Sequence, residues 1–308
     1  MIKRLLKNPI SVTGLVLVLF FAFIALAAPL LAPPPRPCQP FLSYWVPAWI
    51  LESLGQRVQP CNPYKIPQDG RWATPRPPNE KHLLGTTAYQ YDILYGLIWG
   101  TRTAFHVGLT VTLSILAIGL ILGALSGYYG RWIDELLMRV TEIFLAFPFL
   151  VAAMVLTAIL GRGLDKVMIA LIVFGWPTYA RLVRGEVLSA KEREYVLAAR
   201  ASGASDGRII FRHVLPNTIY PALVLASLDM GSMVLSAAAL SFLGLGSETG
   251  YADWGQMISF TRNYLTELDE YWYTVIYPGG AILLFVLGWN LLGDAFRDVL
   301  DPRLRGVK

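Results

Sequence analysis

The sequence contains few charged residues. Only 15% of its 308 residues are Asp, Glu, Lys or Arg, whereas soluble globular domains carry about 25%. Hydrophobic residues make up 55% of the chain, and the mean hydropathy is +0.50. This balance argues against an ordinary soluble domain and is typical of a protein embedded in a membrane.

The sequence also lacks the motifs of common enzymes. No G-x-x-x-x-G-K-[ST] phosphate-binding loop occurs, so we expect no ATP site of that kind. H-E-x-x-H is missing as well. The three histidines, His82, His106 and His213, fall in separate regions, which argues against a His-based metal site. We therefore expect no catalytic residues, no metal site and no bound cofactor in this chain.

Long apolar runs are abundant instead. A helix needs about 20 apolar residues to cross about 30 Å of hydrocarbon. The first run, 10–31, contains no charged residue. Five more runs of suitable composition are found at about 103–127, 137–160, 167–182, 219–245 and 274–292, the fourth being the shortest. We predict an all-α, polytopic bundle of six transmembrane helices.

The first run has an alternative interpretation. Lys3, Arg4 and Lys7 precede it, as in a secretory signal peptide that is removed from the mature protein. Its apolar length of 22 residues exceeds the usual core of such a peptide and favours a retained helix.

The distribution of basic residues predicts the orientation. With the N-terminus in the cytoplasm, the cytoplasmic segments hold 16 of the 26 Lys and Arg residues, and the short external loops hold only Arg162, Lys166 and Arg262. Such a bias is typical of the cytoplasmic side, so we expect both termini there. The net charge of +5 then reflects topology, and its scatter over separate loops gives no basis for nucleic-acid binding.

The segment 33–82 is rich in proline and contains both cysteines, Cys38 and Cys61. In an extracytoplasmic location a disulfide between them is favoured over two free thiols. Between the cysteines, the aromatic stretch 41–56 is interrupted by Pro47. It is expected either to rest on the outer membrane interface as a short helix or to pack against the other external loops.

One carboxylate lies inside a predicted span. Asp229 falls near the middle of 219–245, one helical turn before Met233. A charged side chain at that depth costs about 2.5 to 3.5 kcal/mol on insertion scales and normally faces a bundle interior or a wet cavity. We expect Asp229 either to line a transport pathway together with Met233 or to pair with a donor on a neighbouring helix.

The polar segment 192–217 separates two spans on the predicted cytoplasmic side. A helix over about 192–202 is expected to end at Gly203, a favoured residue after a helix C-terminus. Ser205 is placed to cap a second helix that begins at Asp206. Pro216 is expected to push Leu215 out of helical geometry and to end that second helix.

This segment carries a resemblance. Its sequence AARASGASDGRIIFRHVLPN is similar to the EAA loop of ABC-importer permeases, in which two alanines, a glycine and a Leu-Pro pair recur. Ala198, Ala199, Gly203, Leu215 and Pro216 fall in that register. The glutamate usual in the family would fall at Leu197, and Glu194 lies one turn earlier.

Further stretches are similar to the C-type permeases of dipeptide and oligopeptide importers. They are GYYGRWIDELLMR (127–139), GWPTYARLVRGEVLSAKEREYV (175–196), LSFLGLG (240–246) and NLLGDAFRDVLDPRLR (290–305). The resemblance covers about residues 83–305, so 83–308 is expected to be the permease core. The spans and topology assign 1–32 to the N-terminus and first span and 33–82 to an extracytoplasmic insertion, for which the family offers no alignable counterpart.

The resemblance implies a multi-chain importer in the cytoplasmic membrane. A second, related permease, two ATPase subunits that bind ATP and Mg, and an external solute-binding protein would be the partners. The residues expected to contact an ATPase are Glu194, Tyr195, Val196, Ala198, Ala199, Gly203, Ala204, Ser205 and Asp206. Peptides are the expected cargo, with nickel, glutathione or a sugar as alternatives. The rival class is an ion-coupled secondary transporter without an ATPase, which would be expected to show more ionisable residues in its spans.

Overall fold

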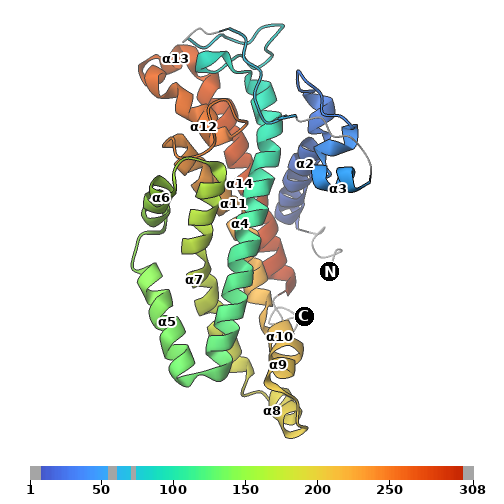
Figure 1. The fold of residues 1–308 in the computed structure, drawn as a ribbon, viewed down its shortest axis with the longest axis vertical. Helices are drawn as coiled ribbons and strands as arrows, with labels where there is room; N and C mark the ends of the chain where they lie inside the picture. Colours follow the sequence, from blue (N-terminus) through green and yellow to red (C-terminus); the bar gives the residue numbers. More distant parts are fainter. Residues whose placement is uncertain (1–7, 55–60, 71–73, 301–308) are drawn as a thin grey trace.

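The fold is an elongated helical bundle, seen in a computed structural model that describes residues 8–54, 61–70 and 74–300 (Figure 1). Within these residues every regular element is a helix, and β-pairing is limited to isolated bridges such as Lys65 with Tyr251. We refer to the two ends of the bundle by the helices that lie there, the α8 end and the α13 end (Figure 1).

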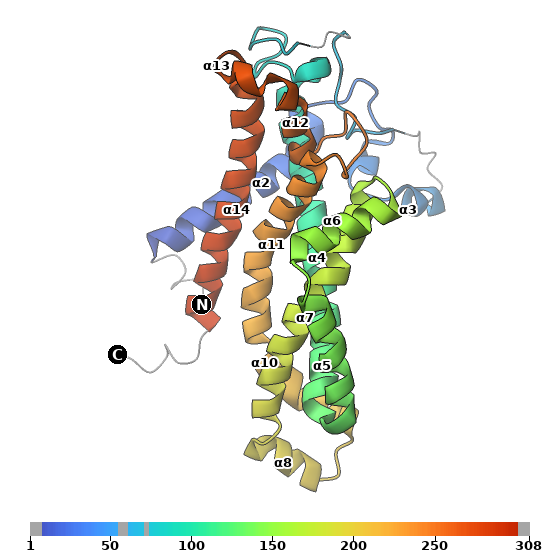
Figure 2. The same ribbon diagram turned by 90° about the vertical axis from the view of Figure 1, so that its left-hand side faces the viewer.

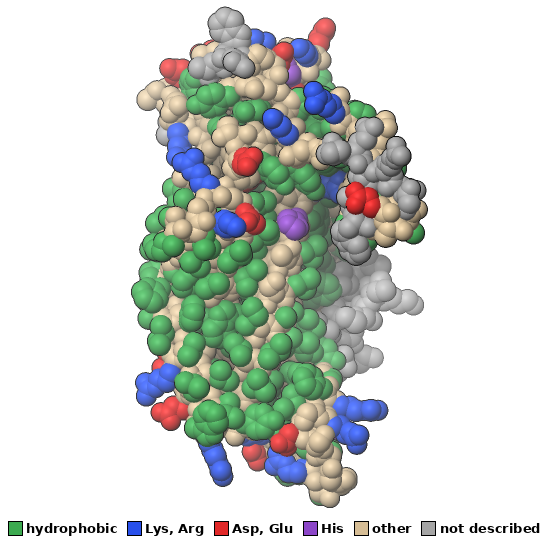
Figure 3. Space-filling view, viewed as in Figure 1, with side chains coloured by type: hydrophobic (Ala, Val, Ile, Leu, Met, Phe, Trp, Pro, Cys, Tyr) green, Lys and Arg blue, Asp and Glu red, His purple; other side chains and the backbone are tan. Residues whose placement is uncertain are grey.

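Five long helices are apolar enough to cross a membrane. They are α2 (Pro9–Leu31), α4 (Ile93–Tyr129), α7 (Leu164–Ala190), α11 (Tyr220–Phe242) and α14 (Tyr273–Leu300). On the face seen in Figure 3, apolar side chains cover the middle and most charged side chains gather toward the two ends. These helices confirm five of the predicted spans, including the short fourth one, which is longer than its apolar run because α7 continues to Ala190.

The predicted span over 137–160 is wrong as a single helix. Two helices occupy it, α5 (Arg131–Leu145) and α6 (Phe149–Leu160), and the angle between them is 85°. Pro148 lies at the break with extended backbone angles, φ −58° and ψ 121°. Because proline disfavours helical geometry in the residue before it, a helix ends there and a second one starts in a new direction.

A row of glycines holds α4 against α7. Gly119, Gly123 and Gly127 are spaced four residues apart and lie on one face of α4. A Cβ added at Gly123 would lie 2.5 Å from the carbonyl oxygen of Ala180, so the two backbones approach as closely as glycine allows. Such rows of small residues permit close helix packing in membranes.

The remaining long helices also meet at glycines. Gly231 of α11 faces Val286 of α14, and Gly14 of α2 faces the α14 backbone at Leu292. Helix α2 is inclined to the others and crosses α14 (Figure 2). This places α2 on the outside of the bundle, in contact with α14 and α4.

Loops and short helices lie at the α13 end and extend down the side of the bundle next to α2 (Figure 1). We call them the loop cap (residues 32–92 and 243–272, within the described ranges). Its helices are η1 (Phe41–Tyr44), α3 (Ala48–Ser53), η2 (Ala88–Gln90), α12 (Trp254–Ser259), η4 (Phe260–Glu267) and α13 (Leu268–Tyr271).

The aromatic stretch between the cysteines packs inward. It forms η1 and α3, which Pro47 separates. Tyr44 is buried, and its ring lies 5.9 Å from that of Trp99, which is fully buried at the start of α4. The stretch therefore packs on α4, while Phe41 and Trp45 remain exposed.

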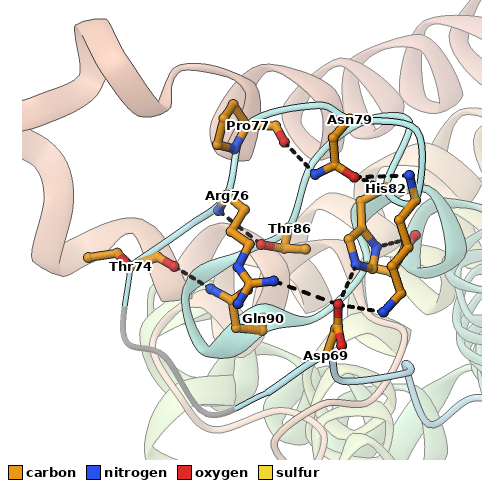
Figure 4. A network of polar contacts seen from close by, with 10 residues as sticks. Asp69, Thr74, Arg76, Pro77, Asn79, His82, Thr86 and Gln90 are labelled. Carbon is orange, nitrogen blue, oxygen red and sulfur yellow. Dashed lines mark hydrogen bonds and ion pairs between the residues drawn. The ribbon is translucent and has the colours of Figure 1, made fainter.

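A disulfide and the polar contacts of one histidine also hold the loop cap in place. The structure joins Cys38 to Cys61 by a disulfide, with a Cα–Cα distance of 5.3 Å. The buried His82 contacts two carboxylates, Asp92 through Nδ1 at 2.6 Å and Asp69 through Nε2 at 3.3 Å (Figure 4). Asp92 in turn accepts a hydrogen bond from the backbone N–H of Tyr95 and caps α4, so the cap is bonded directly to the first turn of the longest helix.

Candidate coupling segment and membrane cavity

Helix α8 (Glu194–Ala201) lies at the tip of the molecule, beyond the ends of the long helices (Figures 1 and 2). One residue attaches it firmly. Val196 is fully buried and belongs to the same apolar core as Ile209 and Val214 of the following turn. Burying a valine contributes about 1.5 to 3 kcal/mol, so this contact helps to anchor α8 on the core.

The end of α8 follows the predicted glycine signal. Gly203 has φ +78°, a conformation that glycine adopts without the steric cost of a Cβ. Its N–H donates to Arg200 O, and the N–H of Ala204 donates to Ala199 O at 3.1 Å. These two bonds form a Schellman motif, which satisfies carbonyls that a helix end leaves free. The predicted break at Gly203 is confirmed.

The second helix begins where expected, at α9 (Asp206–Arg208), but Ser205 does not cap it with its side chain. The attachment comes from Asp206, whose Oδ1 accepts a 2.7 Å hydrogen bond from the hydroxyl of Tyr128. The guanidinium of Arg200 lies 5.8 Å from the centre of the Tyr128 ring, within the range of a cation–π contact. Tyr128 therefore ties both halves of the segment to the end of α4, a role that the sequence did not reveal.

The prediction that Pro216 ends the second helix is wrong. Helical geometry continues through the π-helical turn η3 (Ile209–Val214) and α10 (Leu215–Thr218), and Leu215 itself has φ −54° and ψ −44°. In the π turn, Leu215 N–H donates to Ile210 O, five residues earlier. Pro216 then falls in the first turn of α10, where a missing N–H costs little.

The predicted contact residues divide between two faces. Val196 points into the core, and Ala199 and Ala204 are partly buried against it. The exposed members are Glu194, Tyr195, Ala198, Gly203, Ser205 and Asp206. Leu197 lies on the exposed side as well, with 46% of its surface accessible.

Asp229 has one of its two predicted environments, a hydrogen-bond donor on a neighbouring helix, and its place in a transport pathway stays a prediction. The hydroxyl of Tyr179, on α7, donates to Asp229 Oδ2 at 2.8 Å, so the carboxyl is paired with a neighbouring helix. It also lines a cavity of about 170 Å³ next to the break between α5 and α6. The lining residues are Phe144, Leu145, Phe147, Phe149, Phe174, Gly175, Thr178, Leu225, Asp229 and Met233.

A metal centre is not indicated by the geometry. Across residues 8–54, 61–70 and 74–300, no group of three or more His, Cys, Asp or Glu side chains is arranged to hold a metal ion.

A family model matches the part of the chain that contains both the α8 segment and the cavity at Asp229. Residues 119–306 match the model of the binding-protein-dependent transport system inner membrane component, and residues 1–45 match the N-terminal transmembrane domain of oligopeptide transport permease C. The first match contains α8, Gly203 and Asp229 and extends over more than half of the chain. The chain belongs to this transport family. It is a multi-pass membrane protein with the helices described above.

Similar proteins match along nearly the full chain. The dipeptide transport system permease protein DppC of Alkalihalophilus pseudofirmus is 37% identical over 98% of this chain and 89% of its own length. The di/tripeptide transport system permease protein DppC of Pseudomonas aeruginosa is 37% identical over 97% of this chain and 90% of its own. Matches of this extent run across segment 33–82.

Other relatives match over a shorter range. The glutathione transport system permease protein GsiD of Pectobacterium atrosepticum is 39% identical over 74% of this chain and 75% of its own. Among solved structures, the MetNI methionine ABC transporter in inward-facing conformations has a chain with a TM-score of 0.52 and 21% identity, covering 70% of this chain and 98% of that one. At that identity the likeness concerns the fold alone.

Proposed function

We propose that this chain is one of two permease subunits of an ATP-driven importer for di- and oligopeptides. The observation that carries the proposal is the 37% identity, along 98% of the chain, to a permease named for dipeptide transport. The P. aeruginosa relative, named for di- and tripeptides, supports the same cargo. A peptide is therefore favoured over nickel or a sugar.

The proposed importer contains partner subunits in addition to this chain. A second, related permease forms the other half of the pathway, and two ATPase subunits, which hold ATP and Mg, attach to the α8 end. An external solute-binding protein docks on the opposite end, where the loop cap lies. This arrangement places both termini and α8 in the cytoplasm, in agreement with the 16 basic residues that the predicted cytoplasmic segments contain.

Helix α8 is the proposed contact with an ATPase. It projects from the bundle, its exposed side carries Tyr195 and Leu197, and Ala198 and Gly203 keep that side narrow. Force on α8 reaches the spans through two firm attachments, the buried Val196 and the hydrogen bond from Tyr128 to Asp206. Nucleotide then shifts the pathway between conformations because it favours one position of α8 over another.

The test is reconstitution of transport from purified components. The chain is co-expressed with its genomic neighbours for a second permease and two ATPases, and uptake of a labelled dipeptide into proteoliposomes is followed with the external binding protein. We expect uptake that requires ATP, the binding protein and this chain together. Uptake by this chain alone, driven by an ion gradient, would instead establish a secondary transporter.

A further inference from the structure

The cavity beside Asp229 has an unusual composition for a gap between membrane helices. Four phenylalanine rings line it, and Asp229 is its acidic member. Phe144 and Phe174 are in ring contact, with their centroids 5.6 Å apart. Pockets that recognise a ligand combine apolar and aromatic walls with a few polar groups that fix its orientation. The carboxyl of Asp229 and the hydroxyl of Thr178 are such groups.

The carboxyl of Asp229 is only partly engaged. Tyr179 donates to Oδ2, and in the described parts of the chain no Lys, Arg or His forms an ion pair with Asp229. Its side chain is partly accessible, and neither of its oxygens is among the buried polar atoms that lack a partner. Asp229 lines the cavity, and the hydrogen bond from Tyr179 leaves lone pairs of its carboxyl available to a ligand.

Size and chemistry together indicate the ligand. A volume of about 170 Å³ is below the roughly 300 to 1,000 Å³ of pockets that enclose a whole small molecule, so only one end of a peptide fits. A carboxylate surrounded by aromatic rings favours a primary ammonium, which gains a charge-assisted hydrogen bond and cation–π contacts. An approaching ammonium also favours the ionised form of the carboxyl.

We infer that Asp229 and its phenylalanine-lined cavity form a transient binding site for the free amino terminus of a peptide as it passes through the membrane. This inference rests on the proposed function and adds to it a place and a chemical group for recognition within the spans. Asp229 accepts the ammonium, Tyr179 holds the carboxyl in position, and Thr178 lies close enough to the same cavity to meet the first peptide group.

The experiment uses photo-crosslinking on the assembled importer in lipid nanodiscs, with no binding protein and no nucleotide. Two probes are compared at equal millimolar concentration, the dipeptide alanyl-photoleucine and its N-acetylated form, and mass spectrometry locates the attached probe. We expect the free-amine probe to label residues 174–178 or 225–233, and the acetylated probe to label them at least about tenfold less.

Three variants separate binding from structure. Asp229→Asn is expected to lower labelling by the free-amine probe about tenfold, while Asp229→Glu retains most of it. Tyr179→Phe removes the hydrogen bond and keeps the carboxyl, so labelling is expected to persist. Equal labelling by the two probes, unchanged labelling in Asp229→Asn, or an equal loss in Tyr179→Phe would overturn the inference, as would absence of label from both stretches.

Two features keep the result interpretable. If Asp229→Asn does not assemble, the comparison of the two probes on the unaltered protein still decides the question. Failure of the proposed function would appear separately, as absent ATP-dependent uptake by the unaltered complex, because labelling is measured without ATP or binding protein.

Discussion

Arg184 of α7 donates two hydrogen bonds to Asp134 of α5, from Nε to Oδ1 at 2.5 Å and from Nη2 to Oδ2 at 2.6 Å. Ser126 of α4 donates to the same carboxylate at 2.5 Å. The pair is mostly shielded, since the Arg184 and Asp134 side chains are 32% and 18% exposed. A bidentate pair has a fixed geometry as well as a favourable energy, so it holds α5 against α7 and α4 near the α8 end.

Removing either partner should loosen α5. We expect Asp134→Asn to lower the free energy of unfolding by about 1.5 to 3 kcal/mol, the usual worth of a hydrogen bond to a charged group. Arg184→Lys should lower the free energy of unfolding nearly as much, because lysine keeps the charge but cannot form the bidentate hydrogen bond. Thermal unfolding of the purified protein, with the double variant completing a cycle, measures the coupling. If the losses in the two single variants sum to the loss in the double variant within about 0.5 kcal/mol, the two side chains act independently.

The proposed ATPase contact makes a prediction at Gly203. Its φ is +78°, and an added Cβ would meet no atom within 4 Å. Gly203→Leu therefore costs about 1 to 2 kcal/mol of local strain and adds bulk on the exposed side of the segment. We expect the variant to insert in the membrane normally and to retain ATPase subunits poorly during co-purification.

Two further variants distinguish strain from bulk at this position. Asparagine tolerates positive φ, so Gly203→Asn should retain more ATPase than Gly203→Leu. Gly207 also has open space around it but no positive φ, and Gly207→Leu tests bulk alone in the same segment. Undiminished co-purification and substrate-stimulated ATP hydrolysis in Gly203→Leu would refute a partner at this position.

Asp69 predicts an acid sensitivity of the loop cap. A hydrogen bond from Lys81 Nζ at 2.8 Å, followed by the contact with His82, lowers the pKa of the Asp69 carboxyl below its usual value of 3.8. A depressed carboxyl pKa stabilises the fold above the unfolded value, and this contribution is lost as the pH falls through the folded value. The difference in melting temperature between the unaltered protein and Asp69→Asn should therefore be constant above about pH 5 and shrink below about pH 4.

The matched control is Asp269→Asn, which alters an exposed carboxyl that forms no ion pair in the described parts of the chain. Melting curves from intrinsic fluorescence between pH 3.5 and 7 give both differences. A pH-independent difference for Asp69→Asn would show that its contacts with Lys81 and His82 do not favour the ionised form.

Length and hydropathy alone predicted most of the spans, because an uncharged apolar run as long as 10–31 is sufficient to cross the hydrocarbon as a helix. The break at Pro148 was missed because the apolar run continues across it. Composition does not show that the helix axis changes direction there. The error at Pro216 has the opposite cause. A proline usually marks the end of a helix, but here a π turn accommodates it, and hydrogen bonding of that kind has no reliable sequence signal.

The candidate site was predictable in part. Gly203 and the neighbouring alanines identified the segment, and Asp229 was notable as a carboxyl at membrane depth. Neither Tyr128 nor Tyr179 could be assigned, because each acts across 50 to 78 residues of sequence. Local patterns cannot show such pairings, which depend on how α4 and α7 pack.

The link between Cys38 and Cys61 leads to the last prediction. The two residues are 23 positions apart, and a bridge that closes a loop of that size is worth about 3 kcal/mol on chain-entropy grounds. Tyr44 lies inside the loop and packs on Trp99, so Cys38→Ser with Cys61→Ser should release η1 from α4 and expose the backbone at 41–44 to protease. Helices distant from the cap, such as α7, should keep their protection. A thiol count on the denatured, unreduced protein checks the starting point, with no free thiol expected, and two free thiols would contradict the bridge.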